Sequence, residues 1–308
     1  MAKLKNLMES KSDEIQNFLD SFDTIVTDCD GVLWTGKQPI EKSLETIEKL
    51  EKLGKKIIFA SNNSTLSVED YCEKFRKFGY PAAPEQIVIP SIVICWYLKN
   101  RKFDGKVFVV GTTTFCKVIK NEGVFVAEPC PDRIIEGYEE ITEQFQADLD
   151  VKAVIIDMDV NVTWLKIIKS IRYLKDRNVL YLAGALDRKI PFGKNKTILG
   201  MSPFVDLISE ETGREPIECA KPSIIFKSYI IDKYKLDDPS RCLFIGDSFE
   251  NDMQFADLCG FQKLWVASGI DTLESIQIDG KRSTANDRYS IPHYYLPSLG
   301  HLLDRLNN

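Results

Sequence analysis

A short apolar segment that runs directly into two aspartates constrains this chain most. Residues 25–27 read Ile-Val-Thr, and Asp28, Cys29, Asp30 and Gly31 follow at once. In an open α/β sheet, ligands bind at the carboxyl ends of the strands, which is where these acids would lie. Two carboxylates this close repel each other unless a cation, a shared proton or free solvation compensates them. The segment therefore predicts either a functional site at a strand end or an ordinary polar turn.

Two more apolar segments also end in polar side chains. The first, residues 57–60, is followed by three residues with hydroxyl or amide groups: Ser61, Asn62 and Asn63. The second, residues 243–246, is followed by Asp247 and then by Asp252. Lys221 stands before Pro222 and Ser223, a pair that is typical of a helix start. Carboxylates, a hydroxyl, amides and a lysine at strand ends are the groups that phosphoryl transfer requires.

The order of these motifs resembles the haloacid dehalogenase (HAD) superfamily. Within it, the chain is similar to the group of 4-nitrophenylphosphatases, phosphoglycolate phosphatases and pyridoxal phosphate phosphatases. The motifs are Asp-Cys-Asp-Gly-Val-Leu-Trp from residue 28, Ser-Asn-Asn-Ser from 61, Lys-Pro at 221 and Gly-Asp-x-x-x-x-Asp from 246. The resemblance covers the chain from about residue 22 to residue 299.

The resemblance implies an α/β fold in which a Rossmann-like parallel-sheet core carries an inserted α/β cap domain of the C2 type. We expect a discontinuous core of residues 1–90 and 201–308, with the cap at residues 91–200. Apolar segments that alternate with helical patterns along the chain agree with parallel sheets. The segment between the Ser61 motif and Lys221 is long enough to form a domain.

The resemblance also implies the chemical roles. Asp28 is the expected nucleophile, which forms an aspartyl-phosphate, and Asp30 is the expected general acid and then base. We expect Mg²⁺ as cofactor, held by Asp28, Asp247 and the backbone carbonyl of Asp30. Asp252 and Asn63 are expected to order the groups that touch the metal or the phosphate. The expected phosphate-binding residues are Cys29, Gly31, Ser61, Asn62 and Lys221.

The cap region departs from the family pattern. Where relatives usually carry Thr-Asn-x-Asp or Thr-Asp-x-Asp, residues 184–187 read Gly-Ala-Leu-Asp, so only the final acid, Asp187, is retained. Ala220 likewise replaces the usual glycine before Lys221. Asp187 is expected to touch the substrate or to close the cap. Because cap contacts select the leaving group, the sequence leaves the substrate open, with phosphoglycolate and pyridoxal phosphate among the candidates.

The composition of the chain limits the classes of binding partner and the cellular compartment that we expect. The net charge of −6 and the lack of a basic stretch argue against nucleic-acid binding. No segment has the length of a signal peptide core or a membrane span, so a cytoplasmic protein without membrane contact is expected. The eight cysteines are scattered, which agrees with a reducing compartment. Oxidation of Cys29, which lies between the two acids, is a further hypothesis.

The sequence therefore predicts an enzyme, a Mg²⁺-dependent phosphatase that hydrolyses small-molecule phosphate monoesters, with 4-nitrophenyl phosphate as a generic substrate. Two alternatives stay open. A phosphotransferase or phosphomutase would use the same pair of aspartates, and a non-catalytic phosphate-binding protein would show no turnover. The family resemblance also makes a homodimer one oligomeric state to test.

Overall fold

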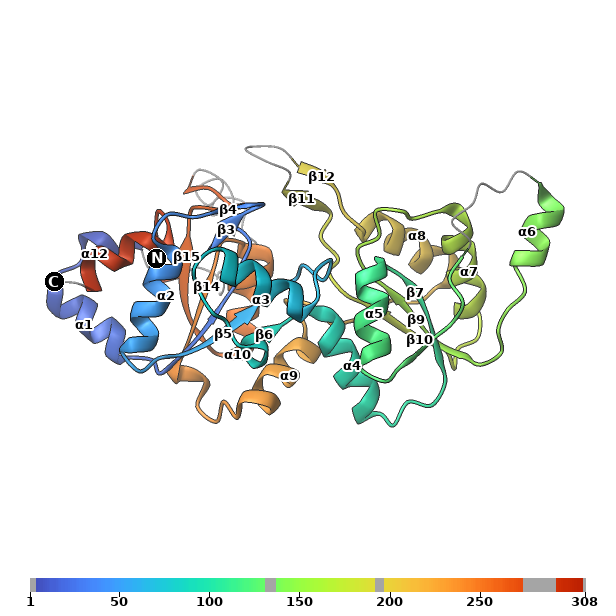
Figure 1. Ribbon diagram of the computed structural model, residues 1–308, viewed down its shortest axis with the longest axis horizontal. Coiled ribbons are helices and arrows are strands. Elements are labelled where there is room, and N and C mark those ends of the chain that lie inside the picture. Colours follow the sequence, from blue (N-terminus) through green and yellow to red (C-terminus); the bar gives the residue numbers. More distant parts are fainter. Residues whose placement is uncertain (1–3, 131–136, 192–196, 274–291, 307–308) are drawn as a thin grey trace.

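The chain forms two parallel β-sheets, each packed against helices. The computed structural model describes residues 4–130, 137–191, 197–273 and 292–306. One sheet and its helices lie in the left half of Figure 1, and the other sheet lies in the right half. The predicted α/β class with parallel sheets is therefore confirmed.

The first sheet has seven strands, and each neighbouring pair runs parallel. In spatial order they are β1 (Lys5–Asn6), β16 (Tyr294–Leu296), β15 (Gln262–Val266), β14 (Cys242–Gly246), β2 (Thr24–Thr27), β5 (Lys56–Ala60) and β6 (Ile87–Val88). The central strands β14 and β2 are buried along their whole length, which explains why they read as almost unbroken apolar runs. The helices of this half are α1 (Ser12–Asp20), α2 (Ser43–Lys52), α3 (Val68–Lys77), α9 (Ile224–Tyr234), α10 (Gln254–Cys259) and α12 (Leu303–Leu306).

The second sheet has five parallel strands, inserted between β6 and α9. In spatial order they are β13 (Ile217–Glu218), β10 (Leu180–Ala183), β9 (Val151–Ile156), β7 (Lys106–Val110) and β8 (Phe125–Val126). Its helices are α5 (Thr113–Asn121), α6 (Tyr138–Gln144), α7 (Trp164–Leu174) and α8 (Ser202–Thr212). Two short antiparallel pairs complete the strands: β3 (Trp34–Thr35) with β4 (Gln38–Pro39), and β11 (Lys189–Pro191) with β12 (Thr197–Leu199).

Helix α4 (Pro90–Asn100) connects the two halves. It packs on α9 from the first half and on α5 from the second. Its buried Ile94 belongs to an apolar cluster that contains Val26 and Phe244 of the first sheet and Ile155 and Leu182 of the second. The two sheets are therefore joined by continuous apolar packing and not by a flexible linker alone.

The predicted domain boundaries at residues 90 and 200 stay predictions, because strand pairing does not test independent folding. The pairing does place β13 beside β10, and Val205 of α8 packs in the apolar cluster of the second sheet. The second sheet thus takes in residues beyond position 200. Strand β13 forms one edge of this sheet, and Val205 and Ile208 of α8 pack in its apolar cluster.

Two observations concern the chain as a whole. In the ranges that the structure describes, no helix is both long and apolar enough to cross a bilayer. All eight cysteines are free thiols, and seven of them are buried. The fold is thus held by apolar burial and backbone pairing without disulfide bonds.

Candidate active site

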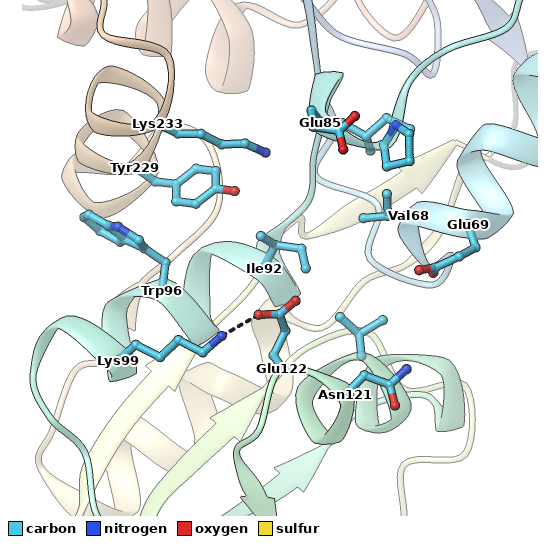
Figure 2. Close-up of a pocket in the computed structure, with 13 residues that line it drawn as sticks. Val68, Glu69, Glu85, Ile92, Trp96, Lys99, Asn121, Glu122, Tyr229 and Lys233 are labelled. Atoms are coloured by element: carbon cyan, nitrogen blue, oxygen red, sulfur yellow. Dashed lines mark hydrogen bonds and ion pairs between the residues drawn. The ribbon is translucent and has the colours of Figure 1, made fainter.

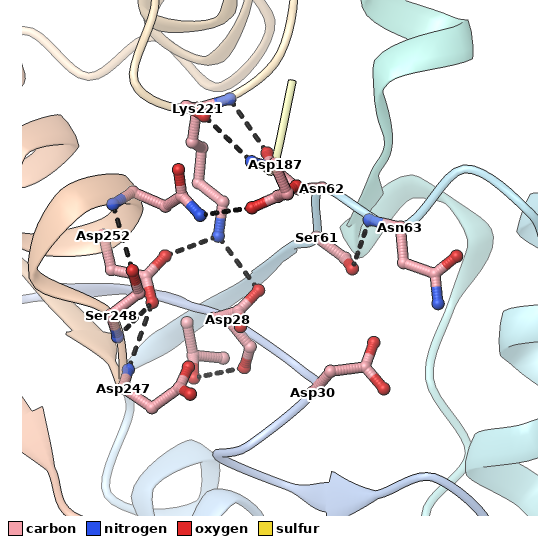
Figure 3. A network of polar contacts seen from close by, with 12 residues as sticks. Asp28, Asp30, Ser61, Asn62, Asn63, Asp187, Lys221, Asp247, Ser248 and Asp252 are labelled. Atoms are coloured by element: carbon pink, nitrogen blue, oxygen red, sulfur yellow. Dashed lines mark hydrogen bonds and ion pairs between the residues drawn. The ribbon is translucent and has the colours of Figure 1, made fainter. Parts of the chain in front are cut away.

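The predicted site residues follow three adjacent strands of the first sheet. Strands β14, β2 and β5 lie side by side, and Asp247, Asp28 and Ser61 come directly after them. Because the strands are parallel, these side chains meet at one edge of the sheet, as Figure 3 shows. Lys221 reaches the same edge from the segment that precedes α9.

Lys221 is the buried cation of this site. Its Nζ donates to Asp28 Oδ1 at 2.9 Å and to Asp252 Oδ1 at 2.7 Å, while its side chain is only 1% exposed. Burial alone would lower the pKa of Lys221, but the charges of Asp252 and Asp28 raise it above its usual range. The lysine is therefore protonated, and it bridges two carboxylates that come from different strand ends.

Asp252 is held on both of its oxygens. Oδ1 accepts from Lys221, and Oδ2 accepts from the backbone amides of Asp247 and Ser248 at 3.1 and 3.2 Å. A π-helical turn, Phe249–Met253, makes this possible, because it widens the start of the helix and turns Asp252 back over the strand end. Asp252 thus contacts both the lysine and the backbone that carries Asp247, and its expected role in ordering the metal or phosphate ligands stays a prediction.

The carboxylates carry more negative charge than Lys221 can balance. Oxygens of Asp28, Asp247 and Asp252 lie within 4.8 Å of one another, and all three residues are buried. Burial raises the pKa of Asp28 to about 7, where the charge of Lys221 opposes it and the charge of Asp252 adds to it. Burial and the charges of Asp252 and Asp28 raise the pKa of Asp247 well above its usual range. This all-oxygen, anionic cluster suits a hard divalent cation.

Two glycines leave room for the Asp247 carboxylate. A Cβ atom at Gly31 or at Gly269 would overlap Asp247 Oδ2. Gly31 also has φ +85°, a conformation that side chains other than glycine rarely adopt. The same oxygen accepts from the amide of Ile270 at 2.6 Å. The chain is thus shaped around this carboxylate, and its residues fit a cation at this point.

The loop after β5 is ordered by its own polar groups and by α3. Ser61 Oγ accepts from the amide of Asn63 at 3.1 Å, and Tyr71 of α3 donates to it at 2.9 Å. Asn63 Oδ1 accepts from the amide of Thr65 at 3.0 Å. Asn63 therefore makes hydrogen bonds within the loop, while Ser61 keeps its hydroxyl at the edge of the site.

Asp187 reaches the first sheet from the loop that follows β10. Its Oδ1 accepts from Asn251 Nδ2 at 2.8 Å, a contact between the two halves of the molecule. Burial raises the pKa of Asp187, and the hydrogen bond from Asn251 opposes this rise. Of the two roles expected for Asp187, the contact agrees with closing the second half onto the first.

A second contact between the halves is buried. Asp157, at the end of β9, is 1% exposed, and its Oδ1 accepts from Ser64 Oγ and from the amide of Met158. Asp157 Oδ2 lies against Gly184, where any Cβ would overlap it. The glycine that replaces the usual threonine of the family motif therefore makes room for this carboxylate. Burial raises the pKa of Asp157 to about 6.

Replacing Asp157 by asparagine is expected to change how stability depends on pH. Because burial raises the pKa of Asp157 to about 6 from 3.8, the folded protein binds this proton more tightly than the unfolded chain. The contribution of Asp157 to the free energy of unfolding therefore improves as pH falls through 6. Between pH 7.5 and pH 5, wild type should gain about 1 kcal/mol relative to Asp157→Asn. Urea unfolding at both pH values measures this, with Asp206→Asn on the surface of α8 as the control. A difference that does not change with pH would contradict the expectation.

A separate pocket lies outside this site. Its volume is about 460 Å³, and it is lined by residues of α3, α4, α5 and α9 together with their flanking loops (Figure 2). Trp96, Tyr229 and Lys233 line it beside the ion pair of Lys99 with Glu122. None of the predicted site residues lines this pocket. We therefore locate the candidate active site from the cluster of polar side chains at the strand ends and not from this pocket.

Comparison with known proteins identifies the family. A model described as haloacid dehalogenase-like hydrolase matches residues 25–125, and a second HAD-hydrolase-like model matches residues 218–300. The 4-nitrophenylphosphatase of Schizosaccharomyces pombe is 33% identical over 304 residues, which cover 96% of this chain and 98% of that protein. The chain belongs to the haloacid dehalogenase-like hydrolases.

Other members of this hydrolase family differ in the ester that their names carry. The glycerol-3-phosphate phosphatase of Mus musculus is 25% identical, covering 94% of this chain and 92% of its own length. The chloroplastic phosphoglycolate phosphatase 1A of Arabidopsis thaliana is 29% identical, covering 84% and 72%. The solved p-nitrophenyl phosphatase from Archaeoglobus fulgidus has a TM-score of 0.77 at 24% identity, covering 92% of this chain and 99% of that chain. The predicted HAD-type fold and family are confirmed.

Two of the predicted phosphate-binding residues, Asn62 and Gly31, make hydrogen bonds within the protein. The side-chain amide of Asn62 donates to the carbonyl oxygen of Lys221 at 2.8 Å and accepts from its amide at 2.9 Å, so Asn62 holds the lysine backbone. The amide of Gly31 donates to the carbonyl oxygen of Trp34 at 2.7 Å. These bonds use the side-chain oxygen and one N–H of Asn62, and the backbone amide of Gly31, while phosphate binding by either residue stays a prediction.

Cys29 is enclosed. Its side chain is 1% exposed, and burial, together with the charges of Asp28 and Asp30, raises the pKa of its thiol well above the usual range. Oxidation requires the thiolate and access to it, so this environment argues against the oxidation hypothesis.

The sequence did not point to Tyr71 or Asn251 as supporting residues. Tyr71 lies on the buried face of α3, where a tyrosine hydroxyl needs a partner, and this polar group on an apolar face was the available signal. Asn251 gave no such signal, because its partner Asp187 is distant in sequence.

Proposed function

We propose that this protein hydrolyses small-molecule phosphate monoesters through an aspartyl-phosphate on Asp28, with Mg²⁺ as cofactor. The observation that carries the proposal is the buried cluster in which Lys221 bridges Asp28 and Asp252 while Asp247 adds a further carboxylate. Such a cluster combines a nucleophile, a cation site and a fixed positive charge for an anionic substrate.

In the proposed reaction, a carboxylate oxygen of Asp28 attacks the phosphorus atom, and the bond to the leaving oxygen breaks. Asp30 gives its proton to that oxygen, so a neutral alcohol leaves. Asp30 then takes a proton from water, whose oxygen attacks phosphorus while the bond to Asp28 breaks and phosphate is released. When bound, Mg²⁺ would neutralise charge on the nucleophile and on the phosphoryl group. Lys221 holds Asp28 in place and balances its charge, and Ser61 offers its hydroxyl to a phosphoryl oxygen.

The identity of the substrate is a more specific proposal than the class of reaction. The named relatives act on 4-nitrophenyl phosphate, glycerol 3-phosphate or phosphoglycolate, so relatedness supports an ester of this size without choosing one. The altered stretch from Gly184 to Asp187 lies where the second half meets the first. We therefore propose that this stretch helps to select the leaving group, with phosphoglycolate and pyridoxal phosphate among the candidates.

A panel of phosphate esters tests the proposed function. It contains 4-nitrophenyl phosphate, glycerol 3-phosphate, phosphoglycolate and pyridoxal phosphate, each with Mg²⁺ and with EDTA. We expect phosphate release with Mg²⁺, a loss of about 100-fold or more with EDTA, and recovery when Mg²⁺ is restored. Activity that EDTA leaves unchanged would exclude the metal, and no release from any ester would exclude the function. Transfer to an added alcohol in place of water would favour the phosphotransferase alternative.

Three further proposals accompany this function. The division into a core of residues 1–90 and 201–308 and a cap of residues 91–200 stays a prediction, and the packing of α8 and β13 with the second sheet favours a cap that extends beyond residue 200. A cytoplasmic location and the lack of nucleic-acid and membrane partners stay predictions from the sequence. A homodimer also stays a prediction, and sedimentation of the purified chain measures it.

A further inference from the structure

The side chain of Asp30 is turned toward two residues that the proposed reaction does not use. Trp34 Nε1 donates to Asp30 Oδ1 at 2.9 Å, and the ammonium group of Lys74 lies 3.9 Å from the same oxygen. Figure 3 shows the Asp30 carboxylate directed away from Asp28 and Lys221. Asp30 therefore has an environment of its own, separate from the buried charge network.

Trp34 is fixed in place from several sides. It is fully buried, and its ring packs against Phe75 at 4.9 Å and Phe78 at 5.9 Å between centroids. Its amide donates to the carbonyl oxygen of Cys29 at 3.3 Å, and its carbonyl oxygen accepts from Gly31 at 2.7 Å. The indole N–H therefore has one fixed direction, and that direction leads to Asp30.

Lys74 adds a positive charge to the same arrangement. It lies on α3, and its Nζ sits 4.1 Å from the centroid of the Trp34 ring. Its side chain is 20% exposed, so the ammonium is partly shielded from water. A cation over an indole face is attracted to the ring, and here it also faces Asp30 Oδ1. Lys74 thus contacts both the residue that holds Asp30 and Asp30 itself.

The two oxygens of Asp30 differ as a result. Oδ1 accepts from the indole and faces the ammonium. Oδ2 is buried and has no hydrogen-bond partner among the residues that the structure describes.

We propose that Trp34 and Lys74 are positioning residues for Asp30: they hold its Oδ1 and so fix the orientation of the carboxyl group that gives a proton to the leaving oxygen. This inference rests on the proposed function, in which Asp30 protonates the leaving alcohol. In that step the O–H bond of the Asp30 carboxyl group breaks, a new O–H bond forms on the leaving oxygen, and Asp30 is left as a carboxylate.

If Trp34 and Lys74 position Asp30, then the effect of their mutation on kcat/KM should depend on the leaving group of the ester. 4-Nitrophenolate is stable as an anion and departs without a proton, whereas an alkoxide must be protonated as it leaves. The ratio kcat/KM covers the steps from free enzyme and substrate through transfer to Asp28. A misplaced Asp30 should therefore lower kcat/KM for an alkyl phosphate and spare kcat/KM for 4-nitrophenyl phosphate.

Trp34→Phe is the first test, because it removes the indole N–H and retains an aromatic ring against Phe75 and Phe78. We expect kcat/KM for the alkyl phosphate that wild type hydrolyses fastest to fall about tenfold. The value for 4-nitrophenyl phosphate should change by less than about twofold. Equal losses for both esters would overturn the inference, because they would indicate a general disturbance of the site.

Lys74→Met is the second test, and it decides the matter if Trp34→Phe does not fold. It keeps the apolar stem over the indole ring and removes only the charge. Lys77→Met is the matched control, since Lys77 lies on the same helix and, among the residues that the structure describes, has the exposed Glu73 as its ion-pair partner. We expect Lys74→Met to show the same selective loss for the alkyl ester, smaller in size, and Lys77→Met to show none. An unchanged ratio of the two esters in Lys74→Met would remove Lys74 from the proposal.

A double-mutant cycle with Asp30→Asn separates positioning from packing. If Trp34 acts through Asp30, then Trp34→Phe should cause no further selective loss in the Asp30→Asn background. A selective loss of the same size in both backgrounds would overturn the inference. Failure of the proposed function is distinguishable, because wild type would then release no phosphate from any ester.

Discussion

Replacing Asp28 by asparagine is expected to lower kcat for every phosphate ester by on the order of 10⁴-fold or more. Asparagine has the shape of aspartate, but its amide oxygen does not form a stable bond to phosphorus. Phosphate release with Mg²⁺ measures the loss. Acid quenching of wild type with ³²P-labelled substrate should trap label on the protein, and the variant should trap none. Equal phosphate release by the two proteins would contradict the role of Asp28 as nucleophile.

The same substitution should not destabilise the fold. Burial raises the pKa of Asp28 to about 7, so its ionised form is costly in the folded protein at neutral pH. Lys221 keeps Asp252 as its partner at 2.7 Å after the change. We therefore expect the free energy of unfolding of Asp28→Asn to equal or exceed that of wild type. Asp20→Asn, at the end of α1, is the control that should retain both activity and stability.

The convergence of Asp28, Ser61 and Asp247 could be expected from the sequence alone. Each follows an apolar segment, and the carboxyl ends of neighbouring parallel strands share one edge of a sheet. The strand order β14-β2-β5 then brings the three side chains together. The sequence also indicated that a lysine would balance the charge of the aspartates, and in the structure buried Lys221 donates to two carboxylates.

The directions of individual side chains and amides could not be predicted in the same way. Asn62 and Gly31 lie in the expected loops, yet their polar groups bond within the protein. Which group of a loop faces the site depends on backbone dihedrals that the motif does not specify. The π-helical turn that aims Asp252 is another such feature, since residues 250–259 have an ordinary helical pattern in the sequence.

Contacts between segments that are distant along the chain also could not be predicted from the sequence. The pairing of Ser64 with Asp157 and that of Asn251 with Asp187 join the two halves. Each depends on how the second sheet packs on the first through α4, which follows from the shape of a large apolar cluster. The replacement of the usual threonine by Gly184 was visible as a departure, but its reason, space for Asp157, required coordinates.

Replacing Lys221 by methionine should cause the largest loss of stability in the site. Methionine retains the length and apolar character of the stem and removes the ammonium, whose Nζ lies 5.2 Å from the centroid of the Phe244 ring. It leaves the buried carboxylates of Asp28 and Asp252 without the ammonium that now donates to both. Breaking a buried ion pair by removing one partner costs about 3–5 kcal/mol. Urea unfolding of wild type and variant without metal at pH 8 measures the difference.

The loss of stability in Lys221→Met should depend on pH and on Mg²⁺. A loss caused by a cavity alone would depend on neither. Without the lysine, the pKa of Asp28 rises above about 7, so the folded variant binds protons more tightly than the unfolded chain. Its deficit should therefore shrink as pH falls from 8 toward 5, where the carboxyl becomes neutral. Saturating Mg²⁺ should stabilise the variant more than wild type, because a cation then meets uncompensated carboxylates. Lys233→Met on α9 is the control, since that exposed lysine faces the rings of Tyr229 and Tyr234. A deficit that is constant with pH and unaffected by Mg²⁺ would show that Lys221 acts through packing and not through its charge.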